Sequence, residues 1–201
     1  MRNSYAVWIG LSLIAALATL AAKYSACFPG DVAVERWVQS LIPQNLDWAQ
    51  GVSRTAEFPW ILLILALIFS LAWTLAGWRA ALLSILSLVG MWALGNWLNP
   101  VIARPRPSPE LVGVFRPLHG YSFPSLFALR YAGTFGFLAV LAAMKSSGVR
   151  RTGLLVGCGA LLLLGWIARV ALGAHWPSDV IISYYLGLLW AACLIRFSTI
   201  V

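Results

Sequence analysis

Three residues near the end of the chain, Arg169, His175 and Asp179, stand in the spacing R-x5-H-x3-D. An imidazole can act as a nucleophile, a carboxylate can orient it, and a guanidinium presents a planar fork that matches phosphate oxygens. The chain has only two histidines and six acidic residues, and these three polar residues lie between two apolar segments. Because charged groups are costly at a membrane, we interpret the cluster as a site that handles phosphate.

Each of the three residues also has a purely structural interpretation. Arg169 could extend from the end of one apolar segment toward the membrane surface. His175 and Asp179 could cap the next helix, in which Pro177 and Ser178 would be the first residues. These alternatives treat the residues separately, whereas a phosphate site explains why they occur together with basic and proline-rich motifs earlier in the chain.

Most of the chain consists of segments that can cross a membrane. Of its 201 residues, 61% are hydrophobic and 10% are charged, whereas about a quarter of the residues of a soluble domain are charged. A helix of roughly 20 apolar residues crosses the hydrocarbon core, and six segments approach that length: residues 5–22, 60–78, 80–101, 125–144, 152–168 and 180–195. The sequence therefore predicts an all-α integral membrane protein, a bundle of six transmembrane helices that forms a single membrane domain over residues 1–201. The first segment is long for a signal peptide, so we expect an uncleaved span.

The formal net charge of +8 is distributed in a way that indicates membrane orientation. Basic residues without acidic neighbours occur in the two terminal segments and in the second and fourth connections: Arg2, Arg79, Lys145, Arg150, Arg151 and Arg196. Because cytoplasmic segments are enriched in Lys and Arg, we expect both termini in the cytoplasm and the cluster around His175 on the outer face. The basic composition is therefore explained by membrane orientation, and we expect no nucleic-acid partner. We expect the protein in a bacterial inner (cell) membrane.

The three cysteines, Cys27, Cys158 and Cys193, show no spacing typical of a disulfide framework, and two of them lie within predicted spans. The sequence therefore predicts no metal site and no cofactor.

The long first connection, residues 23–58, contains an amphipathic pattern. Apolar residues recur at helical spacing on one face: Val34, Trp37, Val38, Leu41 and Ile42. Polar residues occupy the other face: Glu35, Arg36, Gln39 and Ser40. The pattern predicts a helix that lies at the outer membrane interface. Two roles are open for it, a lid that packs on the bundle and a wall of an entrance for lipids.

The third connection, residues 103–124, is rich in arginine and proline. It contains Arg104, Pro105, Arg106, Pro107, Pro109, Arg116 and Pro117. Proline fixes φ and excludes helix, so we expect a stiff connection that holds its arginines beside the membrane. Ser125 then opens the fourth span, where free N–H groups of a helix N-terminus favour anions.

These motifs together resemble the type 2 phosphatidic acid phosphatase family, the membrane branch of the superfamily that includes vanadium haloperoxidases. That family has the motifs K-x6-R-P, P-S-G-H and S-R-x5-H-x3-D, in this order and on one face of six spans. The resemblance covers the whole chain. The matching positions are Arg106, Pro107, Pro124, Ser125, Arg169, His175 and Asp179.

The resemblance implies a role for each matching residue. His175 would be the nucleophile that takes the phosphoryl group, and Asp179 would orient its imidazole and stabilise the imidazolium. Arg106 and Arg169 would bind the phosphate oxygens, with Arg104 as a third candidate. The backbone N–H of Ser125 would complete the anion-binding site.

Four positions depart from the family pattern. Asn99 stands in place of the lysine, Leu126 in place of the glycine, Phe127 in place of the second histidine, and Ala168 in place of the serine. The lost lysine removes a positive charge from the phosphate site. The lost histidine would have been the general acid, whose absence typically costs about 10²–10⁴ in rate.

Two other residues are candidates to compensate. Arg130 lies three residues after Phe127, on the same helix face, and an arginine within a span is a candidate for a functional site. We hypothesise that Arg130 supplies the missing positive charge, the alternative being an arginine that extends outward or binds a carbonyl. His119, in the third connection, is a candidate for the missing proton donor, although a histidine in a loop is commonly just solvated.

Three functions are consistent with these observations. The first is a phosphatase that works through a phosphohistidine with reduced activity, on phosphatidate-like lipids, phosphatidylglycerol phosphate or polyprenyl diphosphates. Without a general acid it should prefer diphosphates, because a phosphate leaving group is a much weaker base than an alkoxide. The second is a non-catalytic protein, a pseudoenzyme that binds or moves a phosphorylated lipid. The third, a channel or transporter for small solutes, leaves the motifs unexplained.

Overall fold

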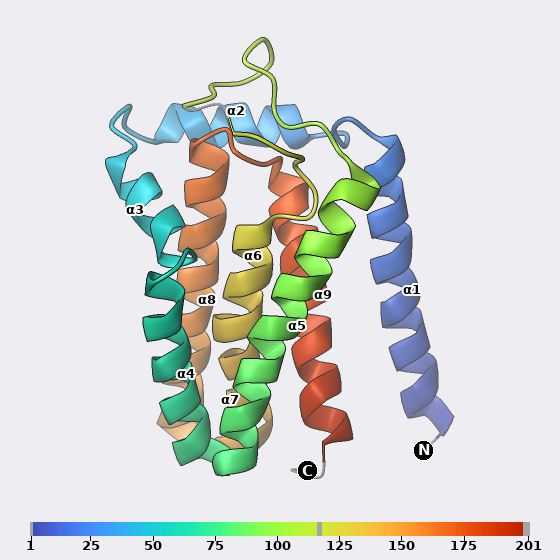
Figure 1. The fold of residues 1–201 in the computed structure, drawn as a ribbon, viewed down its shortest axis with the longest axis vertical. Coiled ribbons are helices and arrows are strands. Elements are labelled where there is room, and N and C mark those ends of the chain that lie inside the picture. The colour runs from blue at the N-terminus through green and yellow to red at the C-terminus, as the bar shows by residue number, and fades with distance from the viewer. Residues whose placement is uncertain (1, 116–117, 199–201) are drawn as a thin grey trace.

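The computed structural model describes residues 2–115 and 118–198, with side chains from residue 5 onward (Figure 1). Arg116 and Pro117 of the third connection lie outside the described residues. The described residues form helices and contain no strand: α1 (Arg2–Tyr24), α2 (Asp31–Leu41), α3 (Asp47–Thr55), α4 (Trp60–Ala76), α5 (Trp78–Ile102), α6 (Leu126–Tyr131), the π-helical turn η1 (Ala132–Gly136), α7 (Phe137–Lys145), α8 (Gly148–Ala171) and α9 (Pro177–Phe197).

The apolar helices confirm the prediction of an all-α integral membrane protein. Within the described residues, five helices are long and apolar enough to cross a membrane: Tyr5–Tyr24, Trp78–Ile102, Leu126–Lys145, Gly148–Ala171 and Pro177–Phe197. The 17-residue helix α4 follows α3 after a bend of 60°, and the bent pair makes a sixth span if it is counted as one.

The continuous helix formed by α6, η1 and α7 is the centre of the bundle. It is the most buried of the candidate spans: 72% of its most apolar stretch lies inside the protein, compared with 11% for α1. Figure 1 shows α1 at the edge of the bundle. Gly187 of α9 allows the closest approach to the central helix, because a Cβ at this position would lie 2.3 Å from the Cβ of Ala132.

Helix α2 runs across one end of the bundle, in the segment where the amphipathic pattern occurs (Figure 1). Most of the apolar face of this helix is turned away from the protein, so the helix does not cover the bundle with its apolar face. Glu35 is completely buried, whereas Val34, Trp37 and Leu41 are exposed. Of the predicted apolar face, Val38 is the residue that is buried.

The polar face of α2 holds the third connection in place. The Gln39 amide exchanges two hydrogen bonds with the backbone of Gly113, at 2.8 Å and 2.9 Å. Arg36 donates from Nε to the carbonyl of Leu111 at 2.7 Å. Arg36 and Gln39, which the helical pattern places on the solvent side, therefore connect α2 to the third connection.

The connection between α8 and α9 packs tightly against the third connection. Gly173 has a φ of +61°, and a Cβ there would lie 2.2 Å from the carbonyl oxygen of Gly113. The N–H of Phe115 donates to the carbonyl of Leu172 at 3.1 Å. These contacts bring the proline-rich segment and the R-x5-H-x3-D segment to the same end of the bundle.

Candidate active site

His175 lies in the connection between α8 and α9, and its side chain is 3% exposed. Its Nδ1 is 2.6 Å from the carbonyl oxygen of Ser122, and its Nε2 is 3.4 Å from Nη1 of Arg106. A carbonyl oxygen only accepts hydrogen bonds, so Nδ1 carries the proton and donates it to Ser122. Nε2 therefore keeps its lone pair and faces a guanidinium.

The surroundings of His175 favour the neutral imidazole. Burial lowers its pKa well below the ordinary value of 6.5, and the positive charges of Arg169 and Arg106 lower it further. The hydrogen bond to the Ser122 carbonyl acts in the opposite direction and is outweighed. At neutral pH the ring is a free base, which is the form that can attack phosphorus.

The resemblance implies that Asp179 orients the imidazole, but among the described residues the His175 ring pairs with Ser122 and Arg106 and has no hydrogen bond to Asp179. Its carboxylate accepts hydrogen bonds from Arg104 and from the hydroxyl of Ser122. Ser122 therefore stands between the two residues, since its carbonyl accepts from His175 and its hydroxyl donates to Asp179. No motif identified Ser122 in the sequence, because its role depends on contacts across 53 and 57 residues.

Arg104 is not placed to bind a substrate phosphate. Its side chain is completely buried and pairs with Asp31 at 3.2 Å as well as with Asp179. It also donates to the carbonyl of Ser25 at 2.9 Å, and its guanidinium carbon lies 4.4 Å from the ring centre of Phe28. The expectation of a third phosphate-binding arginine is corrected: Arg104 joins α2, α9 and the third connection.

Arg106 lies beside His175, in the connection between α5 and α6. Its guanidinium donates to the carbonyls of Ala174 at 2.6 Å, His119 at 3.3 Å and Gly120 at 3.3 Å. Burial lowers the pKa of Arg106, an effect that the negative charge of Asp179 opposes. An arginine stays protonated in a protein, so a fixed positive charge lies beside Nε2 of His175.

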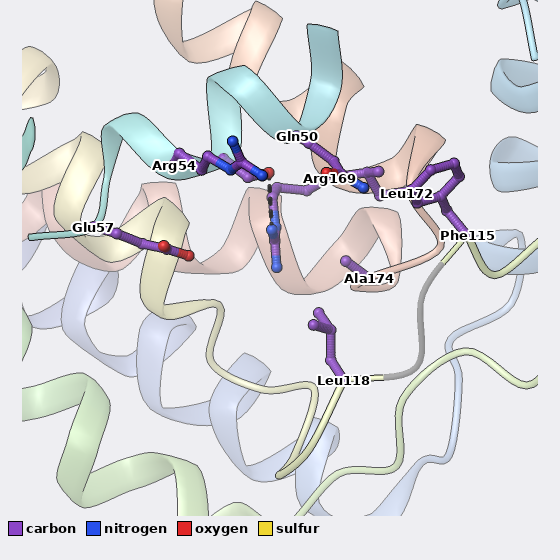
Figure 2. Close-up of a pocket in the computed structure, with 9 residues that line it drawn as sticks. Gln50, Arg54, Glu57, Phe115, Leu118, Arg169, Leu172 and Ala174 are labelled. Carbon is purple, nitrogen blue, oxygen red and sulfur yellow. Dashed lines mark hydrogen bonds between the residues drawn. The ribbon is translucent and has the colours of Figure 1, made fainter. Parts of the chain in front are cut away.

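Arg169 lies in the last turn of α8 and points into the protein rather than toward the membrane surface. Its Nη1 donates to the hydroxyl of Ser53 at 3.0 Å, shown by the dashed line in Figure 2. Its guanidinium carbon lies 5.5 Å from the ring centre of Phe127, and its Nε is buried without a partner among the described residues. The structural interpretation of Arg169 as a residue extended to the membrane surface is therefore excluded.

Two neighbouring cavities open at this end of the bundle. The central cavity is lined by groups that include Arg106, Arg130, Arg169, His175, His119 and Phe127. The adjoining cavity, drawn in Figure 2, is lined by groups that include Gln50, Arg54, Phe115 and Leu172. The two cavities share Ser53, Glu57, Leu118 and Arg169. Three arginines and the histidine of the sequence-based site thus converge on one space.

Arg130 and His119 both line the central cavity. Arg130 donates from Nη1 to the carbonyl of Ala56 at 2.9 Å, as the alternative interpretation of this arginine expects. It lines the cavity as well, where the hypothesis of a compensating charge would need it. The side chain of His119 is exposed, and its carbonyl accepts from Arg106.

Ser125 does not provide the expected anion-binding N–H. Its backbone N–H donates to the hydroxyl of Ser183 at 3.0 Å, and its own hydroxyl accepts from the N–H of Ala128 at 3.3 Å. Ser125 is completely buried and does not line the cavity. It is the N-cap of α6, which corrects the expectation that its N–H binds an anion.

The residues that depart from the family pattern fill space and stabilise the connections. Asn99 donates from its amide to the carbonyls of Tyr121 at 3.1 Å and Phe123 at 3.2 Å. The ring of Phe127 lines the central cavity, and its Cε1 lies 2.8 Å from where a Cβ on Gly165 would be. An aromatic ring thus lies at the position where the P-S-G-H motif has its histidine. No group of three or more His, Cys, Asp or Glu residues that could hold a metal ion occurs within the described ranges.

The sequence profile of the PAP2 superfamily matches residues 61–200. The chain belongs to the PAP2 superfamily. Its fold is similar to the crystal structure of a transmembrane PAP2-type phosphatidylglycerolphosphate phosphatase from Bacillus subtilis, with a TM-score of 0.71 and 20% sequence identity over 94% of each chain. No curated protein matches the sequence. The family assignment agrees with the resemblance seen in the three motifs.

Proposed function

We propose that this PAP2 protein is a membrane phosphatase that acts on a lipid phosphate or a polyprenyl diphosphate through a phosphohistidine at His175. The observation that carries the proposal is the environment of Nε2 of His175, an unprotonated nitrogen 3.4 Å from the Arg106 guanidinium. Arg130 and Arg169 line the same cavity and add positive charge. Membership of the superfamily supports a hydrolase of this class.

The residues suggest a two-step reaction. The arginines bind the oxygens of the terminal phosphate, and His175 Nε2 attacks the phosphorus while the bond to the leaving oxygen breaks. The Ser122 carbonyl holds Nδ1–H, so the charge that develops on the imidazole stays hydrogen-bonded. Water then cleaves the P–N bond and releases phosphate.

The nature of the leaving group follows from Phe127, which cannot donate a proton. A lipid monophosphate that leaves from a diphosphate needs no proton, because the second pKa of a phosphate is about 6. An alkoxide leaving group needs one. The proposal therefore favours polyprenyl diphosphates over phosphatidate, with His119 as a candidate donor for slower monoester hydrolysis.

We place the cavities on the outer face of a bacterial inner membrane, with both termini in the cytoplasm. The charge distribution of the connections supports this orientation. The exposed side chains of Val34, Trp37 and Leu41 support a position of α2 in the outer interface, where their apolar surface meets lipid. In this arrangement α2 forms a wall beside the site rather than a lid.

A non-catalytic lipid-phosphate binder is the second candidate, favoured by the Phe127 ring in place of a proton donor. Phosphate release from a polyprenyl diphosphate and from phosphatidate by purified protein in detergent, beside His175→Ala, separates the two. We expect release that disappears in the variant and is faster with the diphosphate. Release no higher than that of the variant would instead support the binder, and faster release from phosphatidate would contradict the substrate preference.

A further inference from the structure

The side chain of Glu57 faces both cavities, in a place that the sequence motifs do not identify. It lies in the bend between α3 and α4 and lines the central and the adjoining cavity. Figure 2 shows its carboxylate pointing toward the side chain of Arg169. In that view Ala174, the residue before His175, lies on the other side of Arg169.

The backbone around Glu57 is held from both directions. Its N–H donates to the carbonyl of Arg54 at 2.9 Å, and its carbonyl accepts from the N–H of Ile61 at 2.9 Å. The preceding residue, Ala56, accepts a hydrogen bond from Arg130 at 2.9 Å. The backbone at Glu57 is therefore fixed by the ends of two helices and by an arginine of the site.

Glu57 is the only residue with a carboxylate among the described residues that line the two cavities. It interacts electrostatically with Arg130 and Arg169. The oxygens of a carboxylate are acceptors, so the Glu57 side chain can take up a proton.

The second step of the proposed reaction requires such an acceptor. Displacement at phosphorus is in line, so the water that attacks the phosphohistidine enters on the side opposite His175. Glu57 lines both cavities, and the adjoining one also has the polar side chains of Gln50, Ser53 and Arg54, which suit water. In this protein the usual second histidine is absent and Phe127 cannot accept a proton.

We infer that Glu57 is the general base that activates water for hydrolysis of the phosphohistidine. The water oxygen forms a bond to phosphorus, the P–Nε2 bond breaks, and its electron pair returns to Nε2 of His175. One proton of the water passes to the Glu57 carboxylate and later to solvent, and the other leaves with the phosphate. The inference rests on the proposed function and assigns a catalytic residue to its second step.

The test compares Glu57→Gln with the parent and with Glu110→Gln, a matched change of an exposed carboxylate that does not line either cavity. The substrate is farnesyl diphosphate labelled with 32P in its terminal phosphate, and an alkaline quench preserves phosphohistidine. We expect Glu57→Gln to retain label on the protein, to release phosphate about 10²–10⁴ times more slowly, and to recover turnover when hydroxylamine replaces water as the nucleophile. Glu57→Asp should recover part of the rate, and Glu110→Gln should behave as the parent.

Each other outcome overturns the inference in a recognisable way. Parent-like release by Glu57→Gln would show that the carboxylate is not needed. Loss of label and release together would assign Glu57 to binding or to the first step. Accumulation of label in His119→Ala, and not in Glu57→Gln, would make His119 the base. If the parent released no more phosphate than His175→Ala, the proposed function itself would fail.

Discussion

At the scale of single residues, the two arginines of the R-P-R-P segment differ in their partners, and the partners indicate different roles. Arg104 and Arg106 are two positions apart, yet Arg104 faces two carboxylates and Arg106 faces three carbonyls and the imidazole. A carboxylate neutralises the guanidinium, whereas carbonyls fix its orientation and leave its charge for a phosphate. The two arginines should therefore fail in different ways when they are replaced.

We expect Arg104→Met to destabilise the protein and Arg106→Met to inactivate it. Loss of Arg104 leaves Asp31 and Asp179 as buried charges without their cation, and breaking a buried pair in this way costs about 3–5 kcal/mol. Loss of Arg106 removes a charge from the cavity, so phosphate release should fall by at least about 10²-fold with little change in melting temperature. Thermal unfolding in detergent and phosphate release measure the two effects. Equal loss of stability in both variants would contradict the distinction.

The neutral state of His175 gives a second prediction at this scale. Because burial and two arginines lower its pKa below 6.5, the ring should remain reactive toward diethyl pyrocarbonate, which modifies neutral imidazole, as the pH falls from 7 through 6.5. Modification is measured in His119→Ala, so that His175 is the only histidine, and followed by mass spectrometry. If the rate of modification had already fallen by half at pH 6.5 or above, His175 would have an ordinary pKa. The argument that its neutral ring is the nucleophile would then fail.

At the scale of elements, α2 carries the least expected feature of the fold. Glu35, on its polar side, is completely buried, and neither of its carboxylate oxygens has a hydrogen-bond partner among the described residues. Burial raises the pKa of Glu35 to about 9, and the charges of Asp31 and Asp179 contribute to the increase. The folded protein therefore holds a proton on Glu35 at neutral pH.

This proton makes the stability of the fold depend on pH. Between about pH 4.5 and 9 the folded state binds the proton and the unfolded state does not, so the free energy of unfolding falls as the pH rises, by about 1.4 kcal/mol per unit for this group. Glu35→Gln removes the dependence. We expect its melting temperature to exceed that of the parent by a margin that grows from pH 6 to pH 8. A constant or shrinking difference would mean that Glu35 has a partner in solution.

At the scale of the whole molecule, hydrophobicity and three short motifs were sufficient to predict the helices and the family. The predicted spans agree with the helices because an apolar segment of the required length has few alternatives in a membrane. The motifs singled out His175, Arg106 and Arg169, and the structure brings these three residues to one cavity. Asp179 was expected to orient the imidazole and Arg104 to bind phosphate. Instead, Arg104 pairs with Asp31 and Asp179, and Ser122 lies between Asp179 and His175, contacts that no spacing rule predicts. The inward polar face of α2 was missed for the same reason.

The orientation of the bundle is a prediction for the molecule as a whole, since it follows from charges distributed over every connection. Glu110 lies in the third connection and Arg151 in the first turns of α8, at the opposite end of the bundle, and both are exposed. In a variant whose three native cysteines are replaced, Glu110→Cys should react with a membrane-impermeant maleimide in intact bacterial cells. Arg151→Cys should react only after the cells are opened. The reverse pattern would place His175 and its arginines on the cytoplasmic side. That orientation would contradict the one expected from the distribution of Lys and Arg. Labelling of both positions in the same intact cells would indicate mixed insertion, and the charge asymmetry of this chain would then be too weak to set one orientation.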